Sequence, residues 1–304
     1  MTGAAGFIGS HLVGRLLNDG HTVVGIDDGR TGDWSRLDSR CSIINQDLTR
    51  FSADEFEEML EGVDTLFHLA AEKYNSSKVT PQKVIAVNVD ATQKLFDSAG
   101  RVGVRRVVFT SSLYAYGSLG PEDMSELDLP APITVYGASK VMGEHLLRCV
   151  HRDHGLSWAV ARPFFVYGPR QFAQGGYKSV IVKNFERMVA GELPIVNGDG
   201  KQSLDYVYID DVVEGLIRLS KPDADGVTVN LGSGMGIAVN DLTTLMLDIA
   251  DLDIDVQLGP ADWTAGTRRV GNIFYARDRL GWKAEVKLES GLARVWNWMQ
   301  EQNS

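Results

Sequence analysis

Three glycines near the start of the chain constrain its fold more than any other feature. They stand in the motif Gly3-Ala-Ala-Gly6-Phe-Ile-Gly9, which leads into residues 11–18, where apolar residues recur three or four positions apart as on one face of a helix. Glycine permits a tight turn and a close approach of the backbone to a ligand, and the free amides at the start of a helix bind phosphate. The motif therefore predicts a pyrophosphate site at the start of a helix that begins near Ser10.

A strand and a carboxylate follow this motif at the spacing of a dinucleotide site. Residues 22–26 form an apolar, β-branched run, and the pair Asp27-Asp28 comes directly after it, about 20 residues beyond the glycines. A carboxylate there binds a ribose hydroxyl and repels a 2′-phosphate, so the sequence favours NAD over NADP. A further strand is expected over residues 41–45, and the dipeptide Asp47-Leu48 after it is expected to contact the adenine.

The first two thirds of the chain alternate apolar runs with amphipathic segments, which is typical of a parallel sheet covered by helices. After Arg162 the pattern loosens and glycine and proline become frequent. We therefore expect an α/β chain with a doubly wound, Rossmann-type parallel sheet and a smaller C-terminal α/β lobe. The segments behind this expectation are further strands over residues 65–69, 106–110 and 158–161, helices over 83–101, 136–154 and 292–299, and loops at 167–171, 174–176 and 197–200.

The expected domain boundary lies after residue 163. Residues 1–163 would form the NAD-binding domain and residues 164–304 the substrate-binding lobe, of which about residues 205–235 return to the main domain. The strand that normally leads into the glycine turn is missing before Gly3, although it would be the centre of the sheet. Without it, two neighbouring strands keep unpaired backbone groups. We therefore expect the sequence to be truncated at its N-terminus.

A tyrosine and a lysine one helical turn apart are the candidate reactive groups. They lie in Tyr136-Gly-Ala-Ser-Lys140 at the start of a predicted helix, so both side chains share one face. A nearby ammonium favours the phenolate and is expected to lower the tyrosine pKa from about 10 toward the working range. The strand over residues 106–110 delivers Ser111 and Ser112 into the next loop, where Ser112 would bind the reacting oxygen. We therefore expect Ser112, Tyr136 and Lys140 to surround one carbonyl group.

In combination, these motifs resemble the extended short-chain dehydrogenase/reductases of the NAD-dependent epimerase/dehydratase family, which includes nucleotide-sugar 4-epimerases. The resemblance covers almost the whole chain. It rests on Gly3-Ala-Ala-Gly-Phe-Ile-Gly9, Asp27, Asp47-Leu48, His68-Leu-Ala-Ala71, Asn88, Ser111-Ser112, Tyr136-Gly-Ala-Ser-Lys140, Arg162-Pro-Phe, Tyr167-Gly-Pro-Arg-Gln171, Gly198-Asp-Gly200, Tyr208-Ile-Asp-Asp-Val212 and Leu231-Gly-Ser-Gly234.

The resemblance implies a role for each of these residues. Tyr136 would be the acid/base, Lys140 would bind the nicotinamide ribose and tune the tyrosine, and Ser112 would hold the reacting oxygen. The protein would be an NAD-dependent enzyme and, like its relatives, a homodimer that pairs the helices over residues 83–101 and 136–154. The expected cofactor-binding residues are Gly3, Gly6, Phe7, Ile8, Gly9, Asp27, Asp28, Asp47, Leu48, Leu69, Ala70, Ala71, Asn88, Ser111, Tyr136, Lys140 and Pro163.

The loop after the serine strand narrows the reaction. Relatives that eliminate water or carbon dioxide carry an acidic residue there, at the position of Tyr114, and no carboxylate lies between Ser111 and Gly117. This argues against a dehydratase or a decarboxylase. Epimerisation through a transient ketone needs little beyond the serine, tyrosine and lysine, and we favour it over simple oxidation or reduction.

The substrate lobe departs from the nucleotide-sugar pattern. Phe165 replaces an asparagine, Leu204 replaces an arginine that binds diphosphate, and Thr264-Ala-Gly-Thr267 replaces an Arg-x-Gly-Asp stretch. The expected substrate-binding residues are Ser112, Tyr114, Phe165 and four cations that could rebuild an anion site: Arg170, Lys178, Arg268 and Arg269. A nucleotide sugar leads as substrate. The alternatives are a dehydrogenase or reductase of a non-nucleotide sugar, sugar acid or small alcohol, and a non-catalytic NAD-binding regulatory protein.

Composition and charge exclude several other classes of protein. The net charge of −10 opposes binding to nucleic acid. Two cysteines are too few for a disulfide framework, and no Cys/His spacing predicts a metal site. No apolar run approaches the ~20 residues that cross a bilayer, and no secretory signal is recognisable at the N-terminus. We therefore expect a cytoplasmic protein that acts on a small molecule.

Overall fold

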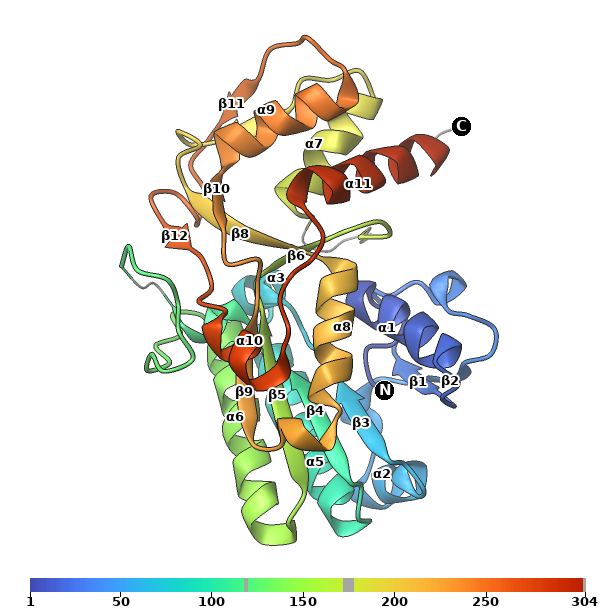
Figure 1. Ribbon diagram of the computed structural model, residues 1–304. Helices are drawn as coiled ribbons and strands as arrows, with labels where there is room; N and C mark the ends of the chain where they lie inside the picture. Colours follow the sequence, from blue (N-terminus) through green and yellow to red (C-terminus); the bar gives the residue numbers. More distant parts are fainter. Residues whose placement is uncertain (118–119, 172–177, 303–304) are drawn as a thin grey trace.

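The computed structural model describes residues 1–117, 120–171 and 178–302, so the loop expected at residues 174–176 lies outside the described part. A large α/β body, at the bottom of Figure 1, carries a smaller lobe above it. Among the described residues, no helix is both long and apolar enough to span a membrane.

The sheet of the body is parallel and has the order that a doubly wound fold requires. One pair of strands, β1–β2, lies beside the set β3-β4-β5-β9, and Thr2 forms parallel bridges to Ile26 of β1 and to His68 of β3. Thr2 therefore occupies the central position between the two sets, and its N–H donates to Phe67 O at 3.0 Å. The strands are β1 (Val24–Asp27), β2 (Ser42–Asn45), β3 (Thr65–His68), β4 (Arg106–Thr110), β5 (Ser157–Pro163) and β9 (Val227–Leu231).

Helices cover both faces of this sheet because its strands are apolar on both sides. In β4, Val108 faces the core shared with α1 and α8, whereas Val107 and Phe109 face the core shared with α5 and α6. The predicted α/β class is therefore confirmed. The helices of the body are α1 (Phe7–Asn18), α2 (Ala53–Leu60), α3 (Tyr74–Val79), α4 (Pro81–Ile85), α5 (Thr92–Arg101), α6 (Val135–His154), α8 (Ile209–Leu219) and α10 (Phe274–Leu280).

The helix expected over residues 83–101 is present, but its middle is not α-helical. A π-helical segment, Ala86–Ala91, separates α4 from α5, and Thr92 Oγ1 donates to Val87 O, five residues back. The wider turn directs Asn88 to the loop after β3, where its amide donates to Glu72 O at 2.9 Å and accepts from Glu72 N at 2.7 Å. The predicted helix is therefore confirmed, and its π-helical segment was not predicted because apolar spacing does not register one extra residue in a turn.

In its described residues, the smaller lobe is built from short strands and three helices around its own part of the core. The antiparallel pair β8–β10 is flanked by parallel neighbours β6 and β12, and β7 pairs with β11. Its elements are β6 (Phe165–Tyr167), α7 (Val180–Val189), β7 (Ile195–Asn197), β8 (Ser203–Tyr208), β10 (Gly236–Ala238), α9 (Val239–Ala250), β11 (Gln257–Gly259), β12 (Arg268–Arg269) and α11 (Leu288–Gln302).

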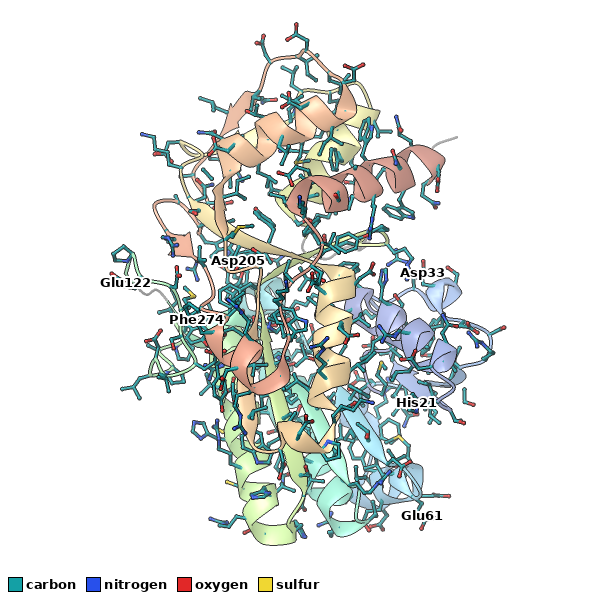
Figure 2. All side chains as sticks on the ribbon, viewed as in Figure 1. His21, Asp33, Glu61, Glu122, Asp205 and Phe274 are labelled. Carbon is teal, nitrogen blue, oxygen red and sulfur yellow. The ribbon has the colours of Figure 1, made fainter. Side chains whose placement is uncertain are left out.

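Asp205 connects the segments where the lobe meets the body (Figure 2). Its carboxylate accepts hydrogen bonds from Ser233 N at 2.7 Å, from Ser233 Oγ at 2.6 Å, and from the backbone N–H groups of Gly234 and Gly271 at 3.1 Å each. One fully buried carboxylate thereby ties β8 to the loop after β9 and to the residues after β12. The position of the lobe over the body depends in part on this group.

Candidate active site

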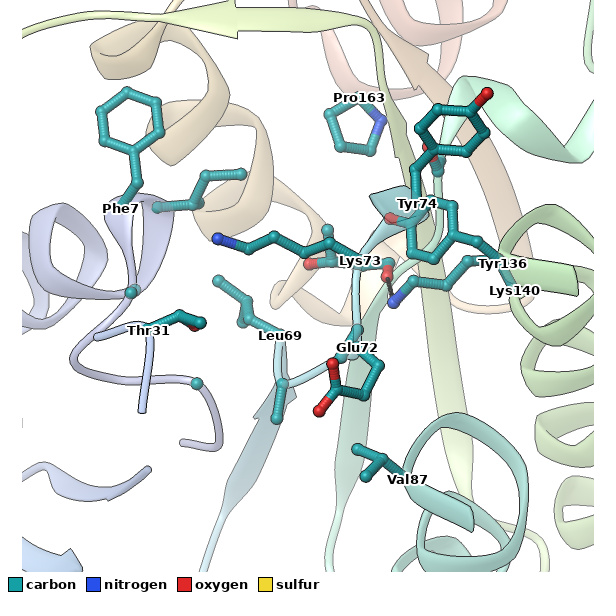
Figure 3. Close-up of a pocket in the computed structure, with 18 of the residues that line it drawn as sticks. Phe7, Thr31, Leu69, Glu72, Lys73, Tyr74, Val87, Tyr136, Lys140 and Pro163 are labelled. Carbon is teal, nitrogen blue, oxygen red and sulfur yellow. Dashed lines mark hydrogen bonds between the residues drawn. The ribbon is translucent and has the colours of Figure 1, made fainter. Parts of the chain in front are cut away.

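A cavity of about 350 Å³ lies at the carboxyl ends of the central strands (Figure 3), which is where open α/β sheets bind ligands. It brings together most of the residues that the sequence analysis selected. The predicted residues that line it are Gly3, Gly6, Phe7, Ile8, Gly9, Asp27, Asp28, Asp47, Leu48, Leu69, Ala70, Ala71, Ser111, Ser112, Tyr114, Tyr136, Lys140, Pro163 and Phe165.

The glycine turn at one end of the cavity leaves no room for side chains. A Cβ on Gly9 would lie 2.0 Å from Gly3 O, and a Cβ on Gly3, whose φ is +71°, would lie 2.7 Å from Ala70 N. Helix α1 begins directly after its N-cap, Gly6, and no side chain accepts a hydrogen bond from its first amide groups. The donor-rich helix start and the close backbone fit the pyrophosphate of a dinucleotide.

Asp27 ends β1 and holds this turn in place. Its carboxylate accepts from Ala5 N at 3.1 Å and from Gly29 N at 3.0 Å. Burial, partly opposed by these hydrogen bonds, raises the pKa of Asp27. The carboxylate expected near a ribose therefore also supports the loop that would receive the pyrophosphate.

At the other end of the cavity, the end of β4 and the start of α6 bring Ser112, Tyr136 and Lys140 together. Helix α6 begins after Thr134, whose Oγ1 accepts from Gly137 N at 3.0 Å, and this cap sets the direction of the first turn. Ser112 acts on the phenol of Tyr136, whose pKa it lowers, and its Oγ accepts from Tyr114 N at 3.3 Å. Lys140 Nζ donates to Thr110 O at 2.8 Å and lies 5.9 Å from the centre of the Tyr136 ring. Figure 3 shows Tyr136 and Lys140 next to each other at this end of the cavity.

Burial dominates the electrostatics of this group of residues. It raises the pKa of Tyr136 to about 12, against the opposing effect of Ser112, and lowers the pKa of Lys140 to about 7, against the attraction of Glu144. The expectation that Lys140 lowers the pKa of Tyr136 was wrong, because the pKa of this phenol is raised. The reason is that the ammonium donates to a strand carbonyl and is itself desolvated.

Glu144 organises the floor below these residues. Its carboxylate accepts from Ser111 Oγ at 2.6 Å and from Arg162 Nε and Nη2 at 2.9 and 2.7 Å. All three side chains are buried. This network directs Ser111 toward α6 and fixes the strand ends from which Ser112 extends.

Several residues around the cavity were missed by the sequence analysis. The polar segment Glu72-Lys73-Tyr74 follows the predicted His68-Leu-Ala-Ala71 stretch directly, which is the signal that could have identified it. Glu72 is only 4% exposed and forms ion pairs with Arg30 and with Lys83, the latter at 3.0 Å. Other unpredicted lining residues are Ile26, Arg30, Thr31, Gln46, Val87, Thr110, Leu113, Phe164, Val166, Gln171 and Ser179.

Five predicted site residues do not line the main cavity. Asn88 does not line it but forms hydrogen bonds with Glu72 and Ser139.

The four cations expected to rebuild an anion site have other surroundings than the main cavity. Lys178 forms an ion pair with Glu186 at 2.8 Å, and Arg268 forms one with Asp123. The backbone oxygen of Arg170 accepts a hydrogen bond from Arg36. Arg269 is buried beside Trp263. Local carboxylates therefore hold two of the four cations, and none of the four lines the main cavity.

The cavity at the end of this Rossmann-type sheet has a glycine turn at one end and serine, tyrosine and lysine at the other. This combination defines a dinucleotide-dependent enzyme of the short-chain dehydrogenase/reductase class. A model of the NAD dependent epimerase/dehydratase family matches residues 1–232. The chain belongs to this family, and it is an NAD-dependent enzyme of the extended short-chain dehydrogenase/reductase type.

Relatives of known name agree with this assignment. The chain is 34% identical over 307 residues to a UDP-glucose 4-epimerase of Mycolicibacterium smegmatis, covering 97% of this chain and 96% of the relative. It is 32% identical over 310 residues to UDP-glucuronic acid decarboxylase 6 of Arabidopsis thaliana, covering 96% and 85%. The structure of UDP-glucose 4-epimerase from Thermotoga maritima with UDP-glucose superposes with a TM-score of 0.94 at 30% identity, covering 100% and 98%.

Proposed function

We propose that the protein is a nucleotide-sugar 4-epimerase that acts on a UDP-sugar. The observation that carries the proposal is one continuous cavity with a glycine cradle at one end and Ser112, Tyr136 and Lys140 at the other. The UDP-glucose 4-epimerases among its relatives support the same substrate class.

The side chains at the reacting end suit this reaction. As the phenolate, Tyr136 would take the proton of the sugar hydroxyl, and as the phenol it would return one to the ketone oxygen, while Ser112 would hold that oxygen. Lys140 binds the ribose next to the reacting carbon and keeps Tyr136 oriented. The glycine turn and Lys140 would hold NAD, which would supply a reversible hydride acceptor at the reacting carbon.

The residues after Ser112 favour epimerisation over decarboxylation. Identity alone does not separate these reactions, since the chain is 34% identical to an epimerase and 32% identical to a decarboxylase. The loop before Gly117 contains no carboxylate. Glu72 lines the cavity, but Arg30 and Lys83 neutralise it. The other carboxylates of the described lining, Asp27, Asp28 and Asp47, lie at or just after the ends of β1 and β2, at the glycine end of the cavity, so the loop after Ser112 supplies no acid to protonate a second carbon.

The remaining predictions complete the proposal. Residues 1–163 bind NAD and residues 164–304 bind the sugar, with about residues 205–235 in the main domain, as the pairing of β9 with β5 supports. The protein acts in the cytoplasm as a homodimer, and the two cysteines, Cys41 and Cys149, are free thiols.

The test is turnover of UDP-glucose by the purified protein with NAD. We expect its 4-epimer to form without net production of NADH, because the hydride returns to the substrate in each cycle. The product is measured by chromatography and NADH by absorbance.

A dehydrogenase or reductase is the second candidate, because the lobe offers apolar groups where related proteins bind diphosphate. Leu204 is buried, and the ring of Phe165 stacks 6.4 Å from that of Trp263. Stoichiometric NADH from a sugar or alcohol without a nucleotide, together with no epimer from UDP-sugars, would establish this candidate instead.

A further inference from the structure

A second, smaller cavity of about 60 Å³ lies beside the reacting end of the first. Tyr74 and Tyr114 line both cavities, so their rings form the wall between them. The Tyr114 ring stands edge-on to the ring of Tyr136 at 5.4 Å, and Figure 3 shows Tyr74 at the same end of the main cavity as Tyr136. A group bound in the small cavity therefore lies close to the sugar that Tyr136 would contact.

Arg269 places a buried positive charge in the wall of this small cavity. Its side chain comes from β12 and is 3% exposed. Nη1 donates to Gly117 O at 3.1 Å, and the guanidinium lies 4.9 Å from the centre of the Trp263 ring. Nε has no hydrogen-bond partner, and no carboxylate of the described residues pairs with the group.

Such a charge is costly to bury unless an anion meets it. Burial lowers the pKa of Arg269, and only the hydroxyl-bearing rings of Tyr74 and Tyr114 oppose this effect. The planar fork of a guanidinium matches a carboxylate in two parallel hydrogen bonds, one of which would use the unpaired Nε. Among the four predicted cations, Arg269 combines deep burial with an unpaired donor, whereas Lys178 and Arg268 already have carboxylate partners.

The shape of the charge and its neighbours favour a carboxylate as the anion. The cavity of about 60 Å³ has room for such a small group beside Arg269. In a hexose whose fourth carbon reacts at Tyr136, the exocyclic carbon is two bonds away. That carbon is therefore the part of the sugar best placed to reach past Tyr114.

Building on the proposed epimerase function, we propose that this cavity is a carboxylate subsite and that the preferred substrate is a nucleotide-activated uronate. Arg269 binds the carboxylate on the exocyclic carbon of the sugar. Tyr74, Tyr114 and Trp263 enclose it and exclude water, which strengthens the ion pair.

The test compares UDP-glucuronate with UDP-glucose as substrates of the NAD-loaded enzyme. We expect the wild type to have the higher kcat/KM for UDP-glucuronate. Arg269→Gln should lower the ratio of the two kcat/KM values about ten- to hundredfold, the loss of one charge-assisted contact. The ratio for Arg269→Lys should lie between the ratios for the wild type and for Arg269→Gln. The matched control is Arg279→Gln on the exposed face of α10, which should leave the ratio at its wild-type value.

Binding to the wild type supplies a readout that does not depend on a variant. UDP-glucuronate should change the tryptophan fluorescence more than UDP-glucose does, and Trp263→Phe should remove the difference. Equal effects of Arg269→Gln on both substrates, or epimerisation of UDP-glucose without that of UDP-glucuronate, would overturn the carboxylate subsite alone. Turnover of neither UDP-sugar would remove the proposed epimerase function together with it.

Discussion

At the scale of single residues, burial rather than charge pairing sets the ionisation of Tyr136 and Lys140. Tyr136 and Lys140 are both removed from water. Desolvation raises the pKa of the tyrosine and lowers the pKa of the lysine, so it favours the neutral form of each. Lys140 also connects α6 to the end of β4 through Thr110 O. The ammonium therefore positions the helix that carries Tyr136 and, with a pKa of about 7, changes its charge near neutral pH.

Tyr136→Phe tests the role of the phenol. The ring fills the same space and only the hydroxyl is lost, so the fold and the affinity for NAD should persist. We expect kcat to fall about 10²- to 10⁴-fold, the usual contribution of a general acid/base. Turnover assays, NAD titration and thermal unfolding measure the three effects, and a kcat within threefold of the wild type would contradict the assignment.

At the scale of elements, the ends of strands and helices build the site, and their local geometry decides what fits. The glycine turn before α1 brings backbone into contact with backbone, and the π-helical segment before α5 turns Asn88 toward the loop after β3. That loop carries Glu72 and Lys73 to the cavity. Figure 3 shows both side chains among the lining residues.

Two glycines of the same helix give a matched comparison. A Cβ on Gly9 meets Gly3 O at 2.0 Å, whereas a Cβ on Gly14 meets nothing within 4 Å. Gly9→Ala should therefore raise the Kd for NAD by more than about tenfold and cost about 1–3 kcal/mol of stability. Gly14→Ala should stabilise α1 by about 0.5–1 kcal/mol without changing the Kd. Calorimetric titration and denaturant unfolding measure both, and similar Kd values for the two variants would contradict a phosphate site at this turn.

At the scale of the whole molecule, the chain crosses between body and lobe, and buried polar contacts hold the two together. Asp205 ties three segments at this junction. The aromatic group of Tyr74, Tyr114 and Trp263 joins α3 and the loop after β4 to the lobe, with ring centres 5.1 to 5.3 Å apart. The proposed sugar site therefore depends on both parts.

The proposed homodimer gives a prediction at this scale. On the outer side of α6, Met142 is 47% exposed, and His145 and Cys149, which follow at helical spacing, are exposed as well. We expect a mass near twice the 33.3 kDa of the chain in sedimentation equilibrium. Met142→Lys should shift the protein toward the monomer because it buries an unpaired charge in the interface. A wild-type protein that sediments as a monomer would contradict this arrangement.

The sequence by itself determined the α/β class, the glycine turn and the serine, tyrosine and lysine set, because each follows from spacing along a few residues or from the apolar pattern of single elements. Only the tertiary structure decided which residues are desolvated or ion-paired. Lys178 and Arg268 found carboxylates, Arg269 did not, and Tyr136 became harder to ionise instead of easier. These outcomes depend on contacts between segments far apart in the chain, and burial at such contacts changes the energy of a charge more than its neighbours in sequence do.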